Sequence, residues 1–486
     1  MKTTNTSLQL AYKPTILNLA NLFKLHTKYL SWFCAVGIMW LVWQISPAPP
    51  LDQRGVYFLA TLAAAVTLWI SNAFDEYVVA LLLLLCWIFL NLVPIKIALS
   101  GFSDPSWFFV LGALGMGAAV SKTGLLARLA TRLLKVINDD RRALSWLVAG
   151  MGVLITPLLP RIMPRIVVVA PVANAIANGL GFKPRSNESA SLSLAAFTGC
   201  TVLTFMFMTG GTYCLVGWSL LPDAAKAEFG WGTWTLAALP AGIFTILFLL
   251  VGINFLFSAR EVDSEDLKPM PDLSNGDPLT RQEVLSMAIV GCALLGWVSK
   301  PLHGIGEPWI AMTALFFFLA TDVLDKNSFK NNIEWGFLVF FGVSYSLASI
   351  ASHLKIDLWL MNVMDPLVSA VSYHPLAFLL FVLLLVHVLR FFFLSTPAVM
   401  VVLIGLTSWA GHNGIHPGVL LLTALMGVEV WFLPYQHIGY ALAYGYTKGT
   451  AFSHSDGRKL MYLKFIASVI GLVISIPYWQ FLGLIR

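Results

Sequence analysis

The sequence TPLLPRIMPR, residues 156–165, interrupts an apolar stretch that extends from residue 143 to residue 181. Its three prolines cannot lie within one continuous helix without kinking it, because proline lacks the amide hydrogen and its ring clashes with the preceding turn. Arg161 and Arg165 stand four residues apart, a spacing that places two side chains on one face of a helix. Such a break predicts a helical hairpin whose freed backbone groups line a cavity or are buried in protein.

The composition of the whole chain places this break in a membrane protein. Of its 486 residues, 58% are hydrophobic and 11% are charged, and the mean hydropathy is +0.79. Soluble domains carry about 25% charged residues, so this chain cannot cover its surface for water. Apolar runs of roughly 20 residues, the length that crosses a bilayer, recur along the chain and predict an all-α polytopic membrane protein with about 11 transmembrane helices.

Lysine and arginine predict the orientation of the chain. The first 30 residues carry four lysines and no apolar core of a cleavable signal peptide. With the N-terminus in the cytoplasm, inner segments hold 21 basic residues and outer segments hold 6, as the positive-inside rule requires of a multi-pass protein in a bacterial cell inner membrane. The net charge of +6 is divided between the membrane sides, which speaks against a nucleic-acid partner. The five cysteines lack C-x-x-C spacing, and we expect free thiols.

The two halves of the chain have the same order of parts. Each half has a span that opens on tryptophan (Trp107 and Trp335), an amphipathic stretch (122–137 and 352–364), an interrupted apolar region and a span broken by small or polar residues. The orientation above puts the first interrupted region inside and the second outside. Inverted repeats of this kind, each with a re-entrant helical hairpin and a broken transmembrane helix, are typical of secondary transporters.

These features divide the chain into six expected parts. They are a cytoplasmic N-terminal segment at 1–31, first scaffold spans at 32–104, a first repeat core at 105–257 with an inner hairpin at 143–181, a cytoplasmic linker at 258–282, scaffold spans at 283–333, and a second repeat core at 334–486 with an outer hairpin at 375–411 and the last span.

The first repeat supplies candidate substrate ligands. An arginine at the bilayer centre costs at least ~2.5 kcal/mol on insertion scales, so it is a functional candidate, and guanidinium binds carboxylates in bidentate fashion. We therefore expect Arg161 or Arg165 to bind an anion, whereas the alternative is that each snorkels or makes a structural pair. The broken span adds Thr209, Gly210 and Thr212.

The second repeat supplies a smaller polar set. Ser395, Thr396 and Pro397 follow the sequence RFFF, and Gln436 stands behind Pro434. These residues bind the substrate, or they form a proline kink that is satisfied within its helix. Three further residues are candidates for coupling transport to an ion or a proton, with structural pairing as the alternative; they are Glu429, His437 and Arg390.

The order of these motifs resembles the divalent anion/sodium symporter family. The residues that carry the resemblance are GFSDPSWFFVLGALGMGAAVSKTGLL (101–126), TFMFMTGGTYCLVGW (204–218), which is similar to the oxoglutarate/malate branch, and FLPYQ (432–436). The resemblance covers about residues 50–486. It implies elevator-type alternating access for a di- or tricarboxylate, and a homodimer.

The hairpin tips depart from the family pattern. The family carries Ser-Asn-Thr there, for substrate carboxylates and sodium, whereas alignment on Pro171 puts Arg161-Ile162-Met163 at the first tip and the second reads Ser395-Thr396-Pro397. We hypothesise that Arg161 or Arg165 supplies the charge that sodium provides in relatives. Transport is then sodium-independent, by exchange or proton coupling, and the alternative is an ordinary sodium symporter for dicarboxylate or sulfate. We expect no cofactor and no metal site, with sodium left open.

Other classes fit the sequence less well. A cation/proton antiporter needs intramembrane aspartates, which the hairpins and broken spans lack. An intramembrane enzyme needs paired acids, a metal cluster or a nucleophile with its base, and the sequence has no such pattern. The phosphate-binding loop of a primary pump is also absent. We therefore expect a transporter rather than an enzyme.

Overall fold

A computed structural model of the chain describes residues 13–47, 49–71, 74–124, 141–257, 278–368, 374–391, 393–433 and 436–486. Within these ranges the regular elements are α-helices and two short 3-10 turns, and one isolated bridge joins Ile415 to Ile485. The all-α prediction is therefore confirmed. Of the sequence features used above, most of the first amphipathic stretch (125–137), most of the linker (258–277) and Pro434 lie outside the described residues.

Seven described helical segments are long and apolar enough to cross a membrane. Six further apolar segments, of 10–17 residues, accompany them, two of them in the hairpins. The seven are α2 (Gln53–Ser71), α9 (Ile162–Gly179), α10 with its 3-10 extension (Asn187–Met206), α13 (Trp231–Leu256), α14 (Arg281–Val298), α18 (Trp335–His353) and α24 (His454–Phe481).

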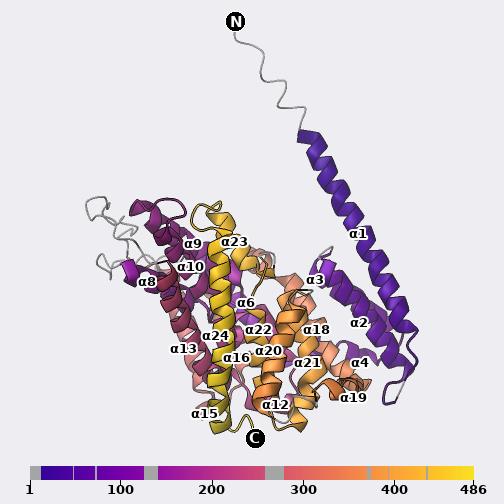
Figure 1. The fold of residues 1–486 in the computed structure, drawn as a ribbon. Helices are drawn as coiled ribbons and strands as arrows, with labels where there is room; N and C mark the ends of the chain where they lie inside the picture. The colour runs from indigo at the N-terminus through magenta and orange to yellow at the C-terminus, as the bar shows by residue number, and fades with distance from the viewer. Residues whose placement is uncertain are drawn as a thin grey trace. The chain divides into compact units, whose positions relative to one another are not determined.

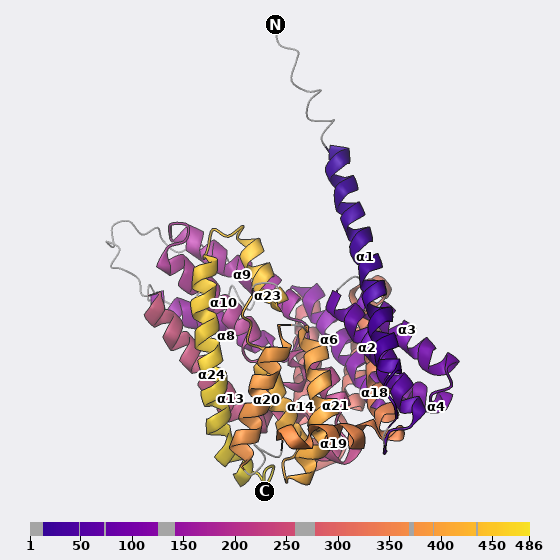
Figure 2. The ribbon, with the colours of Figure 1, turned by 45° about the vertical axis from the view of Figure 1, so that its right-hand side comes forward.

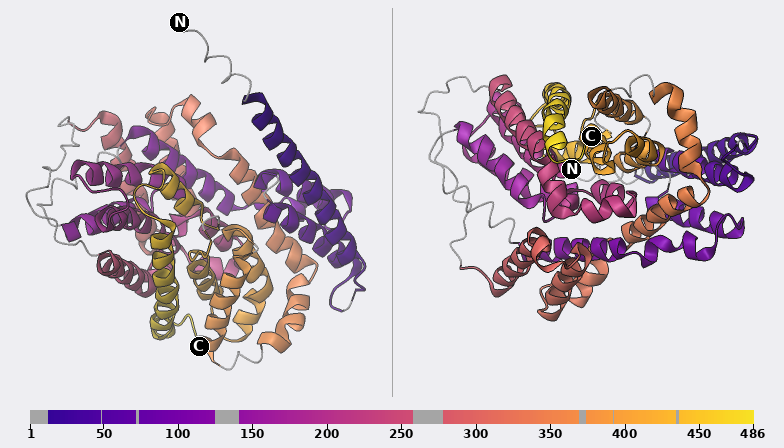
Figure 3. Two further views of the ribbon diagram at one scale, coloured as in Figure 1. Left: turned by 45° about the horizontal axis from the view of Figure 1, so that its top comes forward. Right: turned by 90° about the horizontal axis from the view of Figure 1, so that it is seen from below.

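The chain forms two compact units, each of which is described by itself. The first comprises Met1–Phe102 and Val339–Trp359. In it α1 (Lys13–Trp43) packs along α2, as Figure 3 shows in indigo, and α2 packs on α3 (Glu76–Phe89). The ring of Trp69 on α2 meets Phe340 of α18 edge to face, with centroids 5.7 Å apart. The remaining helices of this unit are α4 (Ile95–Ala98), α5 (Ser100–Ser103) and the start of α19 (Ile356–Val368).

The second unit, Ser103–Leu338 with Leu360–Arg486, holds both interrupted regions. The most extensive helix–helix contact of this unit is between α13 and α24, and these helices run side by side in Figures 1 and 2. The other helices outside the interrupted regions are α6 (Pro105–Thr123), α12 (Asp223–Glu228), α14, α15 (Lys300–His303), α16 (Glu307–Ala320) and α17 (Lys326–Asn332).

The helices break where the prolines and arginines predict. In the first repeat α8 (Arg141–Ile155) ends at the break and α9 begins at Ile162 beyond it. In the second, α20 (Pro375–Leu389) and α21 (Ser395–His412) flank residues 390–394. The broken spans follow their hairpins in chain order. They are α10 (Asn187–Thr201), η1 (Thr204–Met206), η2 (Met208–Gly210) and α11 (Thr212–Ser219), and then α22 (Pro417–Val428) and α23 (Ile438–Tyr446).

Glycine lets the first hairpin lie directly against its broken span. A Cβ atom on Gly199 of α10 would come within 2.0 Å of the Ala149 carbonyl oxygen on α8. Since a side chain cannot fit there, the two backbones touch. The span Asn187–Met206, which contains α10, is almost wholly surrounded by protein. It therefore lies at the centre of the second unit.

Helix ends agree with local sequence at several places. Asp104 caps α6 by accepting a hydrogen bond from the Ser106 amide, with Pro105 in the first turn. Thr280 with Glu283, and Ser453 with Asp456, form capping boxes at the starts of α14 and α24. Each box satisfies amide groups that a helix start leaves without partners.

Two sequence expectations change in detail. Lys464, counted above among the cytoplasmic loop residues, lies within α24 and is 2% exposed, so the inner basic count falls from 21 to 20. The last span, whose apolar run is 465–484, begins earlier than this run, because the Ser453 capping box starts α24 at His454. The five cysteines are free, as expected, but only Cys200 and Cys214 are buried.

Candidate functional site

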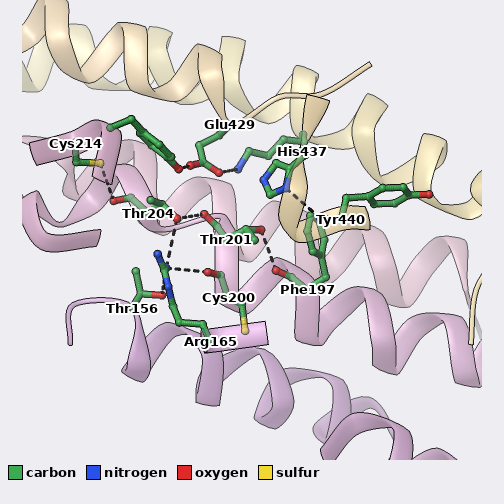
Figure 4. Close-up of polar contacts among 12 residues, drawn as sticks. Thr156, Arg165, Phe197, Cys200, Thr201, Thr204, Cys214, Glu429, His437 and Tyr440 are labelled. Carbon is green, nitrogen blue, oxygen red and sulfur yellow. Dashed lines mark hydrogen bonds and ion pairs between the residues drawn. The ribbon is translucent and has the colours of Figure 1, made fainter. Parts of the chain in front are cut away.

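The first hairpin break is held by Arg165, which is fully buried in the second turn of α9. Its Nη1 donates to Thr156 Oγ1 at 3.0 Å and to the Cys200 carbonyl oxygen at 2.8 Å. Its Nη2 donates to the Gly210 carbonyl oxygen, on the far side of the break in the broken span. Figure 4 shows the guanidinium lying between the hairpin and the end of α10. Arg165 therefore joins the hairpin break to both sides of the break in the broken span. It does so through the Thr156 hydroxyl and the carbonyl groups of Cys200 and Gly210.

The loop of the first broken span is fixed by further contacts. Thr209 Oγ1 donates to the Pro157 carbonyl oxygen at 2.8 Å and accepts from the Trp231 indole at 3.3 Å. A Cβ atom on Gly210 would lie 2.2 Å from the Thr204 carbonyl oxygen, so the loop closes over itself only with glycine there. The hydroxyl of Thr204 also faces Arg165 Nη1, at 3.4 Å.

The second hairpin break is held by a reciprocal pair. Arg390, 1% exposed at the end of α20, donates through Nη1 to the Phe393 carbonyl oxygen at 3.0 Å and through Nη2 to the Gln436 carbonyl oxygen. The Gln436 amide donates back to the Arg390 carbonyl oxygen at 2.9 Å. Gln436 Oε1 also accepts from the amides of Phe432 and Leu433, at 2.5 and 2.9 Å. Both hairpins are thus tied to their own broken spans by a buried arginine.

A buried carboxylate joins the two repeats. Glu429, 1% exposed, ends α22 and accepts a hydrogen bond from the hydroxyl of Tyr213 on α11. Its second oxygen lies 3.9 Å from the ammonium nitrogen of Lys464 on α24. The partner of this acid is therefore a lysine from the last helix, not one of the arginines in the breaks. Figure 4 places Glu429 across the first broken span from Arg165.

Positive charge exceeds negative charge at this centre. Among the described residues, the buried basic side chains are Arg165, Arg390 and Lys464. The buried acids are Glu429 and two glutamates, Glu283 and Glu307, that stand at the starts of α14 and α16. Backbone carbonyl groups orient the guanidinium groups but do not neutralise them. Two buried cations at the helix breaks and a third on α24 therefore stand against one buried carboxylate at this centre.

The other predicted site residues divide into two groups. His437 is buried as the first residue before α23, and its Nδ1 accepts the Tyr440 amide at 3.2 Å, which leaves the proton of a neutral ring on Nε2. Thr396 and Pro397 are buried in the first turn of α21. Thr212 and Ser395 are half-buried at the starts of α11 and α21, helices whose first turns receive no side-chain cap. Such helix starts favour anions.

Arg161 differs from the other two arginines. It precedes α9 at the hairpin tip and forms an ion pair with Glu334, and both side chains are about one third exposed. The Arg161 carbonyl oxygen accepts from Arg165 Nε at 3.2 Å. Arg165 thus contacts the backbone of Arg161, while the Arg161 side chain pairs with Glu334. The two guanidinium groups bind different partners.

Sequence reasoning did not single out Lys464, Tyr213, Thr156 or Thr204 for the site. Lys464 carried a usable signal, because it stands between apolar residues in the run LMYLKFIASV, and a cation inside a span is a functional candidate. Tyr213 carried none that separates it from an ordinary packing residue. Its role depends on Glu429, more than 200 residues away in the chain.

Comparisons with known proteins found a matching family model and several similar membrane proteins. A family model described as the sodium:sulfate symporter transmembrane region matches residues 26–485. The inner membrane protein YbhI of Escherichia coli K12 is 25% identical over 334 residues, which are 67% of this chain and 69% of YbhI. The L-tartrate/succinate antiporter of the same strain is 22% identical over 316 residues, which are 62% of this chain and 63% of the antiporter.

A solved structure has a similar fold. The YdaH transporter of Alcanivorax borkumensis matches 95% of this chain and 98% of its own, with a TM-score of 0.53 and 14% identity. This likeness concerns the polytopic helical fold.

Proposed function

Since this chain belongs to the sodium:sulfate symporter family of membrane transporters, we propose that it carries small organic dianions by secondary transport without sodium. Family membership makes the chain a transporter and not an enzyme. The substrate class and the coupling rest on the charges at the helix breaks.

The observation that carries the proposal is the excess of buried cations. Arg165, Arg390 and Lys464 outnumber Glu429 by two positive charges. Charges far from water are weakly screened, so an uncompensated excess is costly and attracts anions. A dicarboxylate brings the two negative charges that balance it.

The names of relatives support the same substrate class. One relative is an L-tartrate/succinate antiporter, and tartrate and succinate are both four-carbon dicarboxylates. We expect the carboxylates to meet the uncapped starts of α11 and α21, with Thr212, Ser395 and Thr396 as hydrogen-bond donors. In this proposal Arg165 and Arg390 supply positive charge without contacting the substrate, since their Nη groups already donate to protein oxygens.

Fixed cations remove the need for sodium. A sodium ion bound at a hairpin tip would supply one positive charge, and Arg165 and Arg390 already supply one at each break. A further cation there would be repelled by the guanidinium groups. The protein thus binds its substrate with the permanent positive charges of its own side chains. We therefore expect it to exchange one anion for another.

The contacts at the breaks also support an elevator movement. Arg165 ties α9 to the broken span of its repeat, and the Arg390–Gln436 pair does the same in the second repeat. Hairpins held in this way move together with their broken spans. We further propose an inner-membrane location with the N-terminus in the cytoplasm, and a homodimer.

Counterflow in proteoliposomes tests the proposal. Vesicles loaded with unlabelled succinate are diluted into radiolabelled succinate, with either sodium or choline as the only external and internal cation. We expect equal uptake in both cations, with competition by L-tartrate. Uptake that collapses in choline and recovers on addition of sodium would instead make the protein a sodium symporter.

A further inference from the structure

We infer that Glu429 is a proton-binding site and that its proton is taken up together with the transported dianion. This inference rests on the proposed function, because it describes how the same anion site is coupled. It concerns one carboxyl group, its two oxygen atoms and the charges that surround them.

The two oxygens of Glu429 have different surroundings. Oε1 accepts the hydrogen bond from Tyr213. Oε2 is buried and has no hydrogen-bond partner in the described part of the chain, and its nearest cation, Lys464 Nζ, lies 3.9 Å away. That separation exceeds a hydrogen bond, so Lys464 attracts the carboxylate without donating to it. Oε2 can therefore accept a proton while Tyr213 continues to donate to Oε1.

The charged and titratable groups around Glu429 come from several helices. Tyr213 and Cys214 come from α11, Lys464 comes from α24, and Arg165 acts on Glu429 from α9. From α20 come Arg390, which also acts on Glu429, and His387, which packs between Phe432 and Phe465. The remaining neighbours, α13, α21 and η1, carry no titratable residue other than His412 in the last turn of α21.

The sign of the coupling follows from these charges. Burial away from water disfavours the ionised form of Glu429, whereas the three cations stabilise it and oppose its protonation in the absence of substrate. A bound dianion offsets two of the three positive charges, so the carboxylate loses most of this stabilisation. Proton binding then becomes more favourable. By linkage, a protonated Glu429 must in turn bind the dianion more tightly.

Coupled uptake has a clear charge balance. One dianion enters with one proton, which adds to Oε2 as the O–H of a neutral carboxyl group, and no other bond forms or breaks. The proton leaves when the dianion leaves, since the three cations again favour the carboxylate. In an exchange cycle, each dianion then crosses the membrane together with one proton, in either direction.

The wild-type protein alone decides the question. L-tartrate is the probe, because its carboxyl groups ionise at lower pH than those of succinate and stay charged through the measured range. Its binding is titrated calorimetrically in choline buffer at several pH values, with two buffers of different ionisation enthalpy at each value. The difference between the buffers counts the protons taken up.

We expect proton uptake that approaches one per tartrate, and a Kd that decreases by up to about tenfold for each unit of pH decrease. Binding with no proton uptake and no pH dependence would overturn this inference and leave the proposed function standing. No tartrate or succinate binding at any pH would overturn the proposed function, and this inference with it.

A matched pair of variants identifies the group. Glu429→Gln keeps the shape and the acceptor for Tyr213 but cannot take a proton, so we expect tartrate binding that no longer depends on pH. Glu283→Gln is the control, since Glu283 is also buried but lies in the capping box of α14, where glutamine serves equally well. We expect it to keep the wild-type pH dependence. Equal pH dependence in both variants would remove Glu429 from the proposed role.

Discussion

The two hairpin breaks use the same chemical group in different ways. In the first repeat Arg165 follows the break, on the second hairpin helix, and donates to oxygens from three segments without a polar side chain that returns the contact. In the second repeat Arg390 precedes the break, on the first hairpin helix, and shares reciprocal hydrogen bonds with Gln436. The first break is therefore held by one-sided donors, Arg165 and the Thr209 hydroxyl that donates to Pro157, and the second by a reciprocal pair.

This difference shows what the two repeats preserve. The arginines do not occupy equivalent sequence positions, yet each places a guanidinium against carbonyl groups that a broken helix leaves without partners. Inside a membrane such carbonyls need a donor, and an arginine provides several from one side chain. The repeats thus keep one buried positive charge at each break. The position of that charge in the sequence is free to change.

Arg165→Gln should have the largest effect, because glutamine cannot reach the oxygens of Thr156, Cys200 and Gly210 together. We expect a loss of at least about 3 kcal/mol in stability, since several charge-assisted hydrogen bonds disappear from a buried site. The melting temperature in detergent measures it. Arg165→Lys, which keeps the charge and up to three donors, should fall between wild type and the glutamine variant. An unchanged melting temperature for Arg165→Gln would refute the bracing role of this arginine.

Gly210→Ala should cause the second largest loss of stability. The added Cβ atom would lie 2.2 Å from the Thr204 carbonyl oxygen, which cannot move without its backbone. We expect a cost toward the upper end of roughly 1–3 kcal/mol. Gly439→Ala is the counterpart in the second broken span, where the nearest atoms are side-chain methyl groups of Ile162 and Ile166, at 2.7 and 2.8 Å, and not backbone atoms. Its melting temperature should fall less. The reverse order would show that the first broken span is the more adaptable one.

Gln436→Met sharpens the comparison from the second repeat. Methionine fits the space but leaves the amides of Phe432 and Leu433 and the Arg390 carbonyl without their partner. Arg390 still holds the Gln436 backbone oxygen, so we expect a moderate loss of about 1–2 kcal/mol. Thermal melting of Gln436→Met, Arg390→Gln and the double variant measures the coupling between the two residues. Strictly additive effects would contradict the reciprocal pair.

Glu334→Gln should have the smallest effect. The Arg161–Glu334 pair is partly exposed, and such pairs contribute about 0–1 kcal/mol. Asp325→Asn is the control, because Asp325 pairs with Lys122 on the surface at 2.8 Å and this hydrogen bond lowers the pKa of the Asp325 carboxyl. Both variants should melt close to wild type and bind L-tartrate as well as wild type does. If the melting temperature of Glu334→Gln fell as far as that of Arg165→Gln, the Arg161–Glu334 pair would contribute as much to stability as Arg165 does.

Much of the fold can be predicted from the sequence, because proline and charge within apolar runs have strong local consequences. Both hairpin breaks and both broken spans lie where TPLLPR, RFFFLSTP, TGGT and LPYQ stand. The assignment of partners is a different problem. Arg165 and Arg161 look alike in the sequence, yet one is fully buried and the other pairs with Glu334 at the edge.

The same limit applies to the centre of the site. Lys464 reads as a loop residue because basic residues cluster just before it, at Arg458 and Lys459, and only the helix start at Ser453 places it inside the protein. The Glu429 contacts with Tyr213 and Lys464 join segments from both repeats. Tertiary packing alone brings them together, and no local pattern reports it.

The most direct measurement compares succinate with its monoamide in choline buffer. The two molecules have nearly the same shape, but the monoamide carries one negative charge where succinate carries two. If two uncompensated buried cations select the substrate, succinate should bind at least about tenfold more tightly, a difference of roughly 1.4 kcal/mol. Equal affinities would contradict the claim that the buried charge excess at the two breaks determines what this transporter carries.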